Sequence, residues 1–264
     1  MTTMKKQKIV FFDIDHTIYD PHRKEIPEST LEAFKKLSAR QDIYIGIATG
    51  RALYMLDIID VLKPYIDAYI TINGQIVIAD NQVIHDEPLT EKTIKEVKEV
   101  FNNHHLTFGY IGKSTQAINR LNDDIIAMFD EAVMPLPTLD AHFEKHHAVY
   151  QMWAFADDDT FAKMQQELPN HQLVPWLSDG FDVVLDSRSK KDGIIKLLAH
   201  YNISLQHSYC FGDGDNDIEM LELVPHSIAM GNAKESVQQK ATHITEAIHE
   251  DGVYLALKRM GLID

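Results

Sequence analysis

Short apolar runs alternate with amphipathic segments in the first third of this 264-residue chain, and this rhythm limits the folds available to it. Apolar runs at 9–12, 43–48 and 68–72 have the length of strands, and the segments between them have helical periodicity. Strands that are apolar at every position are buried on both faces, as in a parallel sheet covered by helices. The pattern therefore predicts a doubly wound α/β core.

The same rhythm returns after residue 187. Helices are expected at 191–201, at 215–223, from 233 and from 251, with strands at 208–211 and 227–230. We therefore expect the first and last thirds to build one sheet, which assigns residues 1–81 and 188–264 to a single core domain.

The middle third follows a different pattern. It begins at a hairpin pattern, in which 75–79 and 82–85 flank the turn residues Asp80 and Asn81. Beyond the hairpin, helices are expected near 90–103, 122–130 and 158–168, and strands near 106–111, 148–155 and 181–185. Alternation in these strands suits an antiparallel sheet with one covered face, so we expect an inserted α+β domain over 82–187.

The chain is acidic, with 25 Lys and Arg against 40 Asp and Glu and a net charge of −15. Residues 82–187 hold 18 acidic and 7 basic side chains, a net of −11, which leaves a net of −4 for the flanking core. This charge disfavours binding to nucleic acid or to an anionic membrane surface. The negative charge of the inserted domain then belongs either to a well-solvated domain surface or to a lid whose electrostatic field disfavours highly anionic substrates.

Cysteine content and the N-terminal segment indicate a cytoplasmic protein. The single cysteine, Cys210, cannot form a disulfide within the chain, and its apolar neighbours favour a buried strand position. The first apolar run ends at Asp13, too soon for a signal peptide, and no other run is long enough to span a membrane.

Aspartates directly follow two of the predicted core strands. Asp13 and Asp15 follow the first strand, and Asp213, Asp215 and Asp217 follow a strand of the last third. The carboxyl ends of parallel strands share one edge of a sheet, where ligands bind, so both groups are expected there. Converging carboxylates repel one another unless a cation neutralises them. Oxygen ligands of this kind favour Mg²⁺, which accepts phosphate oxygens in its coordination shell.

Two further polar groups lie at the ends of predicted elements. Thr49 and Gly50 end the second strand in the sequence ATGR, where a hydroxyl and backbone N–H groups suit an anion. Lys190 precedes a helix of the returning core, where its ammonium can neutralise a phosphate and a negative transition state. A calcium loop that starts at Asp213 is excluded, because its twelfth position is Val224 instead of Glu.

At these residues the sequence resembles the haloacid dehalogenase superfamily, and within it the Cof-type (type IIB capped) phosphatases. The matching motifs are FFDIDHT at 11–17, IATGR at 47–51, SKKDGI at 189–194 and FGDGDNDIEML at 211–221. The resemblance spans essentially the whole chain. It implies a Rossmann-like core with a variable cap domain between the second and third motifs.

The resemblance implies a role for each acid. Asp13 is the expected nucleophile, which forms an aspartyl-phosphate. Asp15 is expected to protonate the leaving alkoxide and later to activate the hydrolytic water. Mg²⁺ would be held by the carboxylates of Asp13 and Asp213 and by the backbone carbonyl of Asp15.

The remaining motif residues are expected to bind phosphate or to support the site. Thr49, Gly50 and Lys190 are the expected partners of the phosphoryl oxygens, with Asn216 beside them. Asp217 is expected to orient Lys190 or a metal-bound water.

Two residues depart from the family pattern, since His16 and Lys191 each stand where the family usually has glycine. We expect His16 only to tune the turn between the two acids. We assign the motif lysine to Lys190, because it alone keeps the spacing to Gly193 and Ile194.

The four motifs together predict a Mg²⁺-dependent phosphatase for small phosphorylated metabolites, such as a sugar phosphate. One alternative is a phosphomutase on the same scaffold, and another is a non-enzymatic, phospho-accepting domain of receiver type, which is shorter and has no large insertion. In the inserted domain, aromatic and imidazole side chains are candidates for contacts to the leaving group, with core packing or surface exposure as the alternative: Trp153, Trp176, His142, His146 and His147.

Overall fold

The computed structural model describes residues 6–131, 133–175, 179–185 and 188–264. The chain divides into two compact units. The first comprises Met1–Gly50, Leu56–Asp86 and Ser189–Asp264, and the second comprises Arg51–Met55 and Glu87–Arg188. Within the described residues, the helices are all too short or too polar to cross a membrane.

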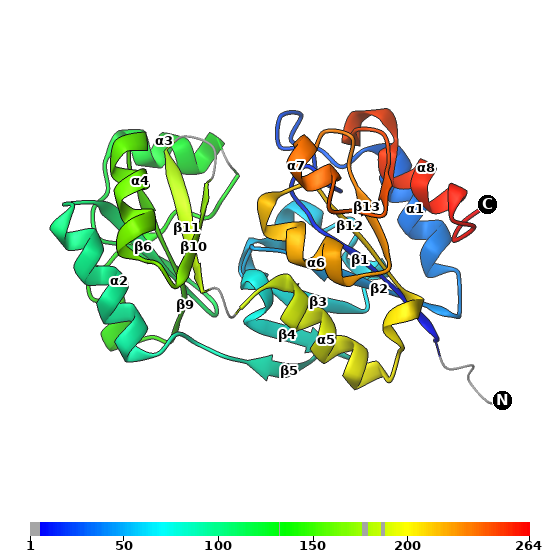
Figure 1. Cartoon of the computed structure of the whole chain (residues 1–264), viewed down its shortest axis with the longest axis horizontal. Helices are drawn as coiled ribbons and strands as arrows, with labels where there is room; N and C mark the ends of the chain where they lie inside the picture. The colour runs from blue at the N-terminus through cyan, green and yellow to red at the C-terminus, as the bar shows by residue number, and fades with distance from the viewer. Residues whose placement is uncertain (1–5, 132, 176–178, 186–187) are drawn as a thin grey trace. The chain divides into compact units, whose positions relative to one another are not determined.

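An eight-stranded sheet runs through the first unit in the order β14-β13-β12-β1-β2-β3-β4-β5 (Figure 1). Its strands are β1 (Lys8–Phe12), β2 (Ile43–Ala48), β3 (Ala68–Thr71), β4 (Ile76–Ala79), β5 (Gln82–Asp86), β12 (Ser208–Gly212), β13 (His226–Ala229) and β14 (His243–Ile244). Strands from β14 to β3 are parallel to one another, whereas β4 pairs antiparallel with both β3 and β5.

Helices cover both faces of this sheet. The helices are α1 (Glu28–Ser38), α5 (Lys190–Tyr201), α6 (Ile218–Leu223), α7 (Glu235–Gln238) and α8 (Gly252–Arg259), with 3-10 turns η1 (Leu53–Ile59), η2 (Lys63–Tyr65), η3 (Ile72–Gly74), η5 (Leu205–His207), η6 (Asp215–Asp217) and η7 (Ile248–Glu250). Val10 and Phe12 of β1 pack in one apolar cluster with α1 and α8, whereas Ile9 and Phe11 pack in another with α5 and α6. Successive residues of a strand face opposite layers, so both layers are buried and the predicted doubly wound α/β core is confirmed.

The second unit is an α+β domain built on a six-stranded sheet in the order β10-β11-β9-β6-β7-β8 (Figure 1). Its elements are α2 (Glu91–Asn103), β6 (Thr107–Gly112), β7 (Gln116–Ile118), α3 (Asp123–Glu131), β8 (Thr138–Leu139), η4 (Phe143–Lys145), β9 (Val149–Phe155), α4 (Asp158–Glu167), β10 (His171–Pro175) and β11 (Gly180–Leu185). Phe101 of α2 and Met164 of α4 are buried with Phe108 and Met152 of the sheet. The two helices thus cover one face. Trp153, on the opposite face of β9, is also fully buried and packs against Phe129 of α3, so the prediction of a single covered face was wrong.

The first unit extends beyond the predicted boundary at residue 81. Strand β5 pairs antiparallel with β4, so the hairpin continues the eight-stranded sheet and the chain leaves this unit after Asp86. The turn residues Asp80 and Asn81 both have positive φ, of 50° and 60°, which suits a tight hairpin. A boundary at residue 81 would divide this hairpin and leave β5 without its hydrogen-bonding partner.

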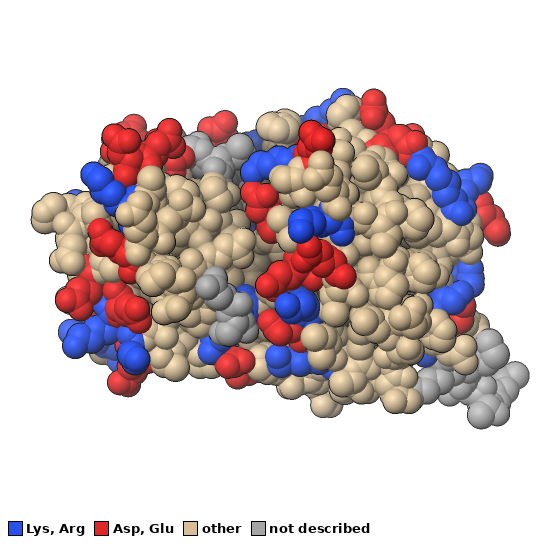
Figure 2. Space-filling model, in the orientation of Figure 1, with Lys and Arg blue, Asp and Glu red and all other residues tan. Residues whose placement is uncertain are grey.

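Part of the negative charge of the second unit lies at helix starts. Figure 2 shows acidic side chains gathered over the region of α3 and α4. Asp123 and Asp124 lie in the first turn of α3, and Asp158 and Asp159 lie in the first turn of α4. Carboxylates in a first turn interact favourably with the helix dipole, so these charges have a structural role. This observation favours the solvated-surface interpretation for them.

Two glycines bring the start of α5 close to the sheet. A Cβ atom on Gly193 would lie 2.4 Å from Ile70 Cγ2 of β3. Gly74, in η3, has a φ of +95°, and a Cβ atom there would lie 2.3 Å from the carbonyl oxygen of Ser189. Larger residues at either position would push α5 away, so this approach places Lys190 beside the carboxyl end of β3.

Gly193→Ala is expected to lower the free energy of unfolding by about 1–3 kcal/mol, because overpacking outweighs the gain in helix propensity. Urea unfolding measures this change. Ile195→Ala, at a position of the same helix that is 49% exposed, is the matched control and should change stability by less than about 0.5 kcal/mol. Equal stability of the two variants would contradict the close approach.

Candidate active site

The carboxyl ends of three parallel strands meet at one edge of the core sheet. Strand β1 lies between β12 and β2, and the register brings the last residues of all three strands side by side. Asp13 follows β1, Thr49 follows β2, and Asp213 follows β12. The backbone N–H of Asp13 donates to Phe211 O at 3.0 Å, so the pairing with β12 continues to the first residue of the site.

A buried ammonium joins two of the aspartates. Lys190 Nζ lies 2.6 Å from Asp13 Oδ1 and 2.7 Å from Asp217 Oδ1, and its side chain is 1% exposed. Lys190 is the first residue of α5, whose start carries a capping box formed by Ser189 and Asp192. The capping box and the two ion pairs together hold the ammonium between the two aspartates.

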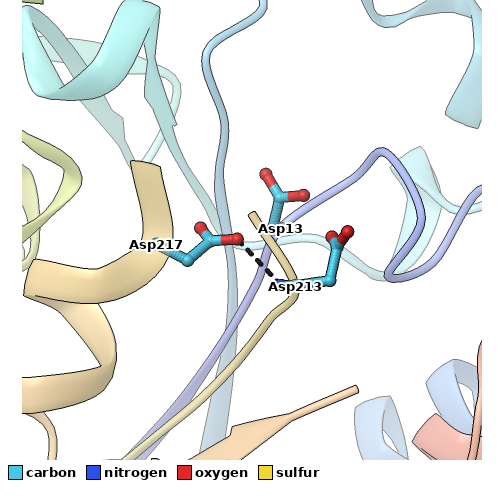
Figure 3. Close-up of side chains that lie close together, drawn as sticks. All are labelled: Asp13, Asp213 and Asp217. Atoms are coloured by element: carbon cyan, nitrogen blue, oxygen red, sulfur yellow. Dashed lines mark hydrogen bonds between the residues drawn. The ribbon is translucent and has the colours of Figure 1, made fainter. Parts of the chain in front are cut away.

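A third carboxylate lies beside these two, and Figure 3 shows the side chains of Asp13, Asp213 and Asp217 close together. One oxygen each from Asp13, Asp213 and Asp217 lies within 4.8 Å of the others. The second oxygen of Asp217 accepts the backbone N–H groups of Asp213 and Gly214, both at 2.9 Å. Thr17 Oγ1 donates to Asp213 Oδ1 at 3.0 Å. Because both oxygens of Asp217 are engaged, Asp13 and Asp213 are the carboxylates best able to accept a further cation.

Burial and charge crowding shift the pKa values of this cluster. Burial raises the pKa of Asp13 to about 7 and that of Asp213 to about 9, and neighbouring carboxylates add to both shifts. Burial alone lowers the pKa of Lys190, but Asp13 and Asp217 raise it above its ordinary value. Three carboxylates around one ammonium leave negative charge to be neutralised. Their hard oxygen donors therefore fit a divalent metal ion.

The predicted phosphate-binding residues lie at the same edge. Thr49 is 1% exposed, and its carbonyl accepts the N–H of Asn73 at 3.0 Å. Asn216 Nδ2 donates to Asn73 Oδ1 at 3.3 Å. A Cβ atom on Gly50 would lie 3.4 Å from the side-chain amide atoms of Asn73, so Gly50 also packs beside this residue. Together these residues form one hydrogen-bonded group around Asn73.

Asp15 and His16 lie in the turn that follows Asp13. Asp15 is half-buried, and its carboxylate is not among the three described carboxylates that converge on Lys190. His16 has a φ of 57°, a left-handed conformation that costs a non-glycine residue about 1 kcal/mol. Its ring lies 5.5 Å from that of His22. A left-handed conformation at this position explains why glycine is the usual residue in the motif.

The choice between the two neighbouring lysines is decided by their contacts. Lys190 contacts Asp13, whereas Lys191 Nζ lies 3.6 Å from Glu219 and its side chain is 38% exposed. Adjacent helical residues point in different directions, so only one of the two can reach the acidic cluster.

Trp153 is a core residue of the second unit, so its proposed contact with the leaving group is not supported. Its side chain is fully buried, packs against Phe129 with ring centroids 5.6 Å apart, and lies over Gly109. The candidate histidines are all on the surface of this unit: His142, His146 and His147. Trp176 lies outside the described residues.

Comparison with known proteins shows the family of this chain. A family model described as haloacid dehalogenase-like hydrolase matches residues 10–257. The chain belongs to this family. The prediction of a Cof-type member of the superfamily, and of an enzyme, is thereby confirmed.

This hydrolase is similar to proteins of about its own length and to one that is about twice as long. It is 33% identical over 97% of its length to Bacillus subtilis "Putative phosphatase YkrA", 98% of which is covered. It is 34% identical over 98% of its length to a Streptococcus pyogenes "Putative bifunctional phosphatase/peptidyl-prolyl cis-trans isomerase", of which it spans 55%, about half. A solved structure of a HAD subclass IIB sugar phosphatase matches with a TM-score of 0.89 and 29% identity, covering 97% of this chain and 100% of that one.

Two residues of the candidate site were not identified from the sequence as site residues. Thr17 bonds Asp213, and Asn73 links the loop of Thr49 to Asn216. Thr17 ends the first motif, so its position in FFDIDHT was a usable signal. Asn73 precedes Gly74 after β3, and the end of a third parallel strand at the same sheet edge was the signal for it.

Lys190→Ala is expected to destabilise the hydrolase by about 3–5 kcal/mol, because it leaves buried carboxylates without their partner. The neighbouring exposed pair supplies the control, since Lys191→Ala should cost less than about 1 kcal/mol. Denaturant unfolding of both variants tests the assignment. Equal losses would show that the buried ammonium does not organise the cluster.

Proposed function

We propose that this protein is a Mg²⁺-dependent phosphatase that hydrolyses small phosphorylated metabolites, such as sugar phosphates, through an aspartyl-phosphate intermediate. The observation that carries the proposal is the buried Lys190 ammonium between Asp13 and Asp217, with Asp213 beside them. A nucleophilic carboxylate with an ammonium on one side and a second metal-binding carboxylate on the other is an arrangement suited to a phosphoryl group.

The residues that would hold Mg²⁺ are the carboxylates of Asp13 and Asp213 and the backbone carbonyl of Asp15. When bound, Mg²⁺ supplies positive charge that reduces the repulsion between a carboxylate nucleophile and a phosphate. Asp217 is not included, because Lys190 and two backbone N–H groups already engage its oxygens.

Asp13 is the proposed nucleophile. Its carboxylate attacks phosphorus, the bond from phosphorus to the alkoxide breaks, and an aspartyl-phosphate forms. Lys190, held by Asp217, keeps the attacking carboxylate in place and lies close enough to neutralise the phosphoryl oxygens. Thr49, with Gly50 and Asn216 beside it, is proposed to bind those oxygens.

Asp15 is the proposed general acid and base. It donates a proton to the departing alkoxide. In the second step its carboxylate accepts a proton from the water that attacks phosphorus, the bond from phosphorus to Asp13 breaks, and inorganic phosphate leaves. Its side chain is half-buried in the turn after Asp13, and its charge is close enough to Asp13 to help raise the pKa of that group.

The substrate class is proposed from the relatives and from charge. One structural relative is a sugar phosphatase, and its structure covers 97% of this chain. A net charge of −15 disfavours polyanionic substrates and membrane surfaces, which leaves small phosphomonoesters as the best match. We propose a cytoplasmic location, where such metabolites occur.

Asp13→Asn is expected to reduce release of inorganic phosphate from p-nitrophenyl phosphate and sugar phosphates by about 10³-fold or more, since the amide is not a nucleophile. Circular dichroism should show an unchanged fold. Asp215→Asn is the matched control, because Asp215 pairs with the exposed Lys234, and it should keep activity within about threefold.

Turnover by Asp13→Asn at the parent rate would contradict the nucleophile assignment. Conversion of one sugar phosphate into another without release of inorganic phosphate would select the phosphomutase. A long-lived phosphoprotein without turnover would select the receiver-type domain, because Asp15 is expected to speed hydrolysis of the intermediate.

Mg²⁺ should stabilise the protein more at pH 8 than at pH 5.5. Without metal, the pKa of Asp13 is raised from 3.8 to about 7 and that of Asp213 from 3.8 to about 9. Protonation of these two groups therefore contributes its full stability to the folded protein below pH 3.8, and this contribution is lost as the pH rises through the two raised pKa values. Protons compete with the metal, so its apparent affinity should rise about tenfold or more between these pH values.

Thermal unfolding with EDTA or Mg²⁺ at both pH values measures this effect. Asp213→Asn is the control variant and should lose most of the Mg²⁺-dependent shift. A shift of equal size at pH 5.5 and pH 8 would show that these carboxylates do not bind the metal.

A further inference from the structure

The residue that follows Asp15 has a strained backbone. His16 adopts a φ of 57°, in the left-handed region that residues with a Cβ atom rarely occupy. Such a conformation persists only when surrounding contacts hold it, and it often accompanies function. Because His16 is bonded directly to Asp15, the backbone at residue 16 helps to set where the Asp15 carboxylate lies.

Hydrogen bonds within the turn shape it locally. The N–H groups of Thr17, Ile18 and Tyr19 all donate to Ile14 O, at 3.2, 2.9 and 2.9 Å. His16 N donates to Tyr19 O at 2.8 Å. These bonds join residues 14 to 19 with one another. The position of the turn relative to the rest of the core depends on the packing of Ile14 and Ile18 in the core cluster, on the bond from Thr17 to Asp213, and on a further side-chain bond that leaves the turn.

Asn232 provides such a bond. Its Nδ2 donates to the carbonyl oxygen of His16 at 3.0 Å, and its Oδ1 accepts the N–H of Ile248 at 2.8 Å. Asn232 lies in the loop after β13, and Ile248 is the first residue of η7. One carboxamide thus uses both its donor and its acceptor to tie the turn to the C-terminal part of the core.

We propose that Asn232 is a positioning residue for Asp15. By holding the His16 carbonyl, it keeps the left-handed turn in the place where Asp15 can reach the leaving oxygen. The inference rests on the proposed function, in which Asp15 protonates the leaving alkoxide. An aspartate at position 232 has the same shape and can still accept from Ile248, but it cannot donate to His16.

Asn232→Asp is therefore tested with two substrates that differ in their need for a general acid. For a sugar phosphate, kcat/KM should fall about 10- to 100-fold, because the alkoxide cannot leave without a proton from a well-placed Asp15. For p-nitrophenyl phosphate, it should fall less than about threefold, because p-nitrophenolate leaves as an anion. The value of kcat/KM reports only the steps up to and including departure of the leaving group, so the later activation of water by Asp15 does not affect it.

A second variant tests the link through His16. Glycine adopts the left-handed conformation without strain. The double variant with His16→Gly and Asn232→Asp should therefore have a kcat/KM for the sugar phosphate at least about threefold higher than that of Asn232→Asp alone. Asn232→Ala, which removes both bonds, should show the same split between substrates. Gln239→Glu is the control, because it makes the same amide-to-acid change at an exposed residue of the core and should leave both substrates unaffected.

Equal losses for both substrates, or no loss for either, would overturn the inference. The proposed function would still stand in that case, provided that Asp13→Asn abolishes turnover of both substrates. If the unaltered protein hydrolyses neither substrate, the proposed function fails and the inference fails with it.

Discussion

The candidate site depends on one buried contact, the Lys190 ammonium between Asp13 and Asp217. This contact joins the start of α5 to the end of β1 and to η6. Asp217 in turn accepts the two N–H groups that follow β12, so elements up to 177 positions apart in the sequence meet through one charge. The close approach of Gly193 and Gly74 to their neighbours makes the contact possible, since it lets α5 begin against the sheet.

A buried ion pair of this kind is a poor source of stability, because desolvation of the charges offsets most of their attraction. Here burial, together with the crowding of neighbouring carboxylates, raises the pKa of Asp13 to about 7 and that of Asp213 to about 9. The same crowding makes the edge a favourable place for a divalent cation. Repulsion between these carboxylates therefore destabilises the folded protein locally, and a bound metal ion can relieve it. Such destabilising charge clusters are common at functional sites.

Much of this arrangement followed from sequence spacing, because residues after parallel strands must share one edge of the sheet. Asp13, Thr49 and Asp213 could be placed together on that basis. The boundary at residue 81 was wrong, because a hairpin pattern does not reveal which sheet its second strand continues, and β5 extends the core sheet. The sequence left Trp153 as a candidate contact to the leaving group, because residue order does not reveal that its ring packs against Phe129 and Gly109.

The sequence by itself determined the chemistry available to this protein: a run of apolar strands, aspartates after two of them, a threonine after a third and a lysine before a returning helix. These features are local and depend only on residue type and spacing. Tertiary structure decided which of two adjacent lysines reaches the acids, which oxygens of Asp217 are engaged, and how Asn232 holds the turn at His16. Such choices depend on directions and distances between segments that lie up to about 200 positions apart, and only packing sets those.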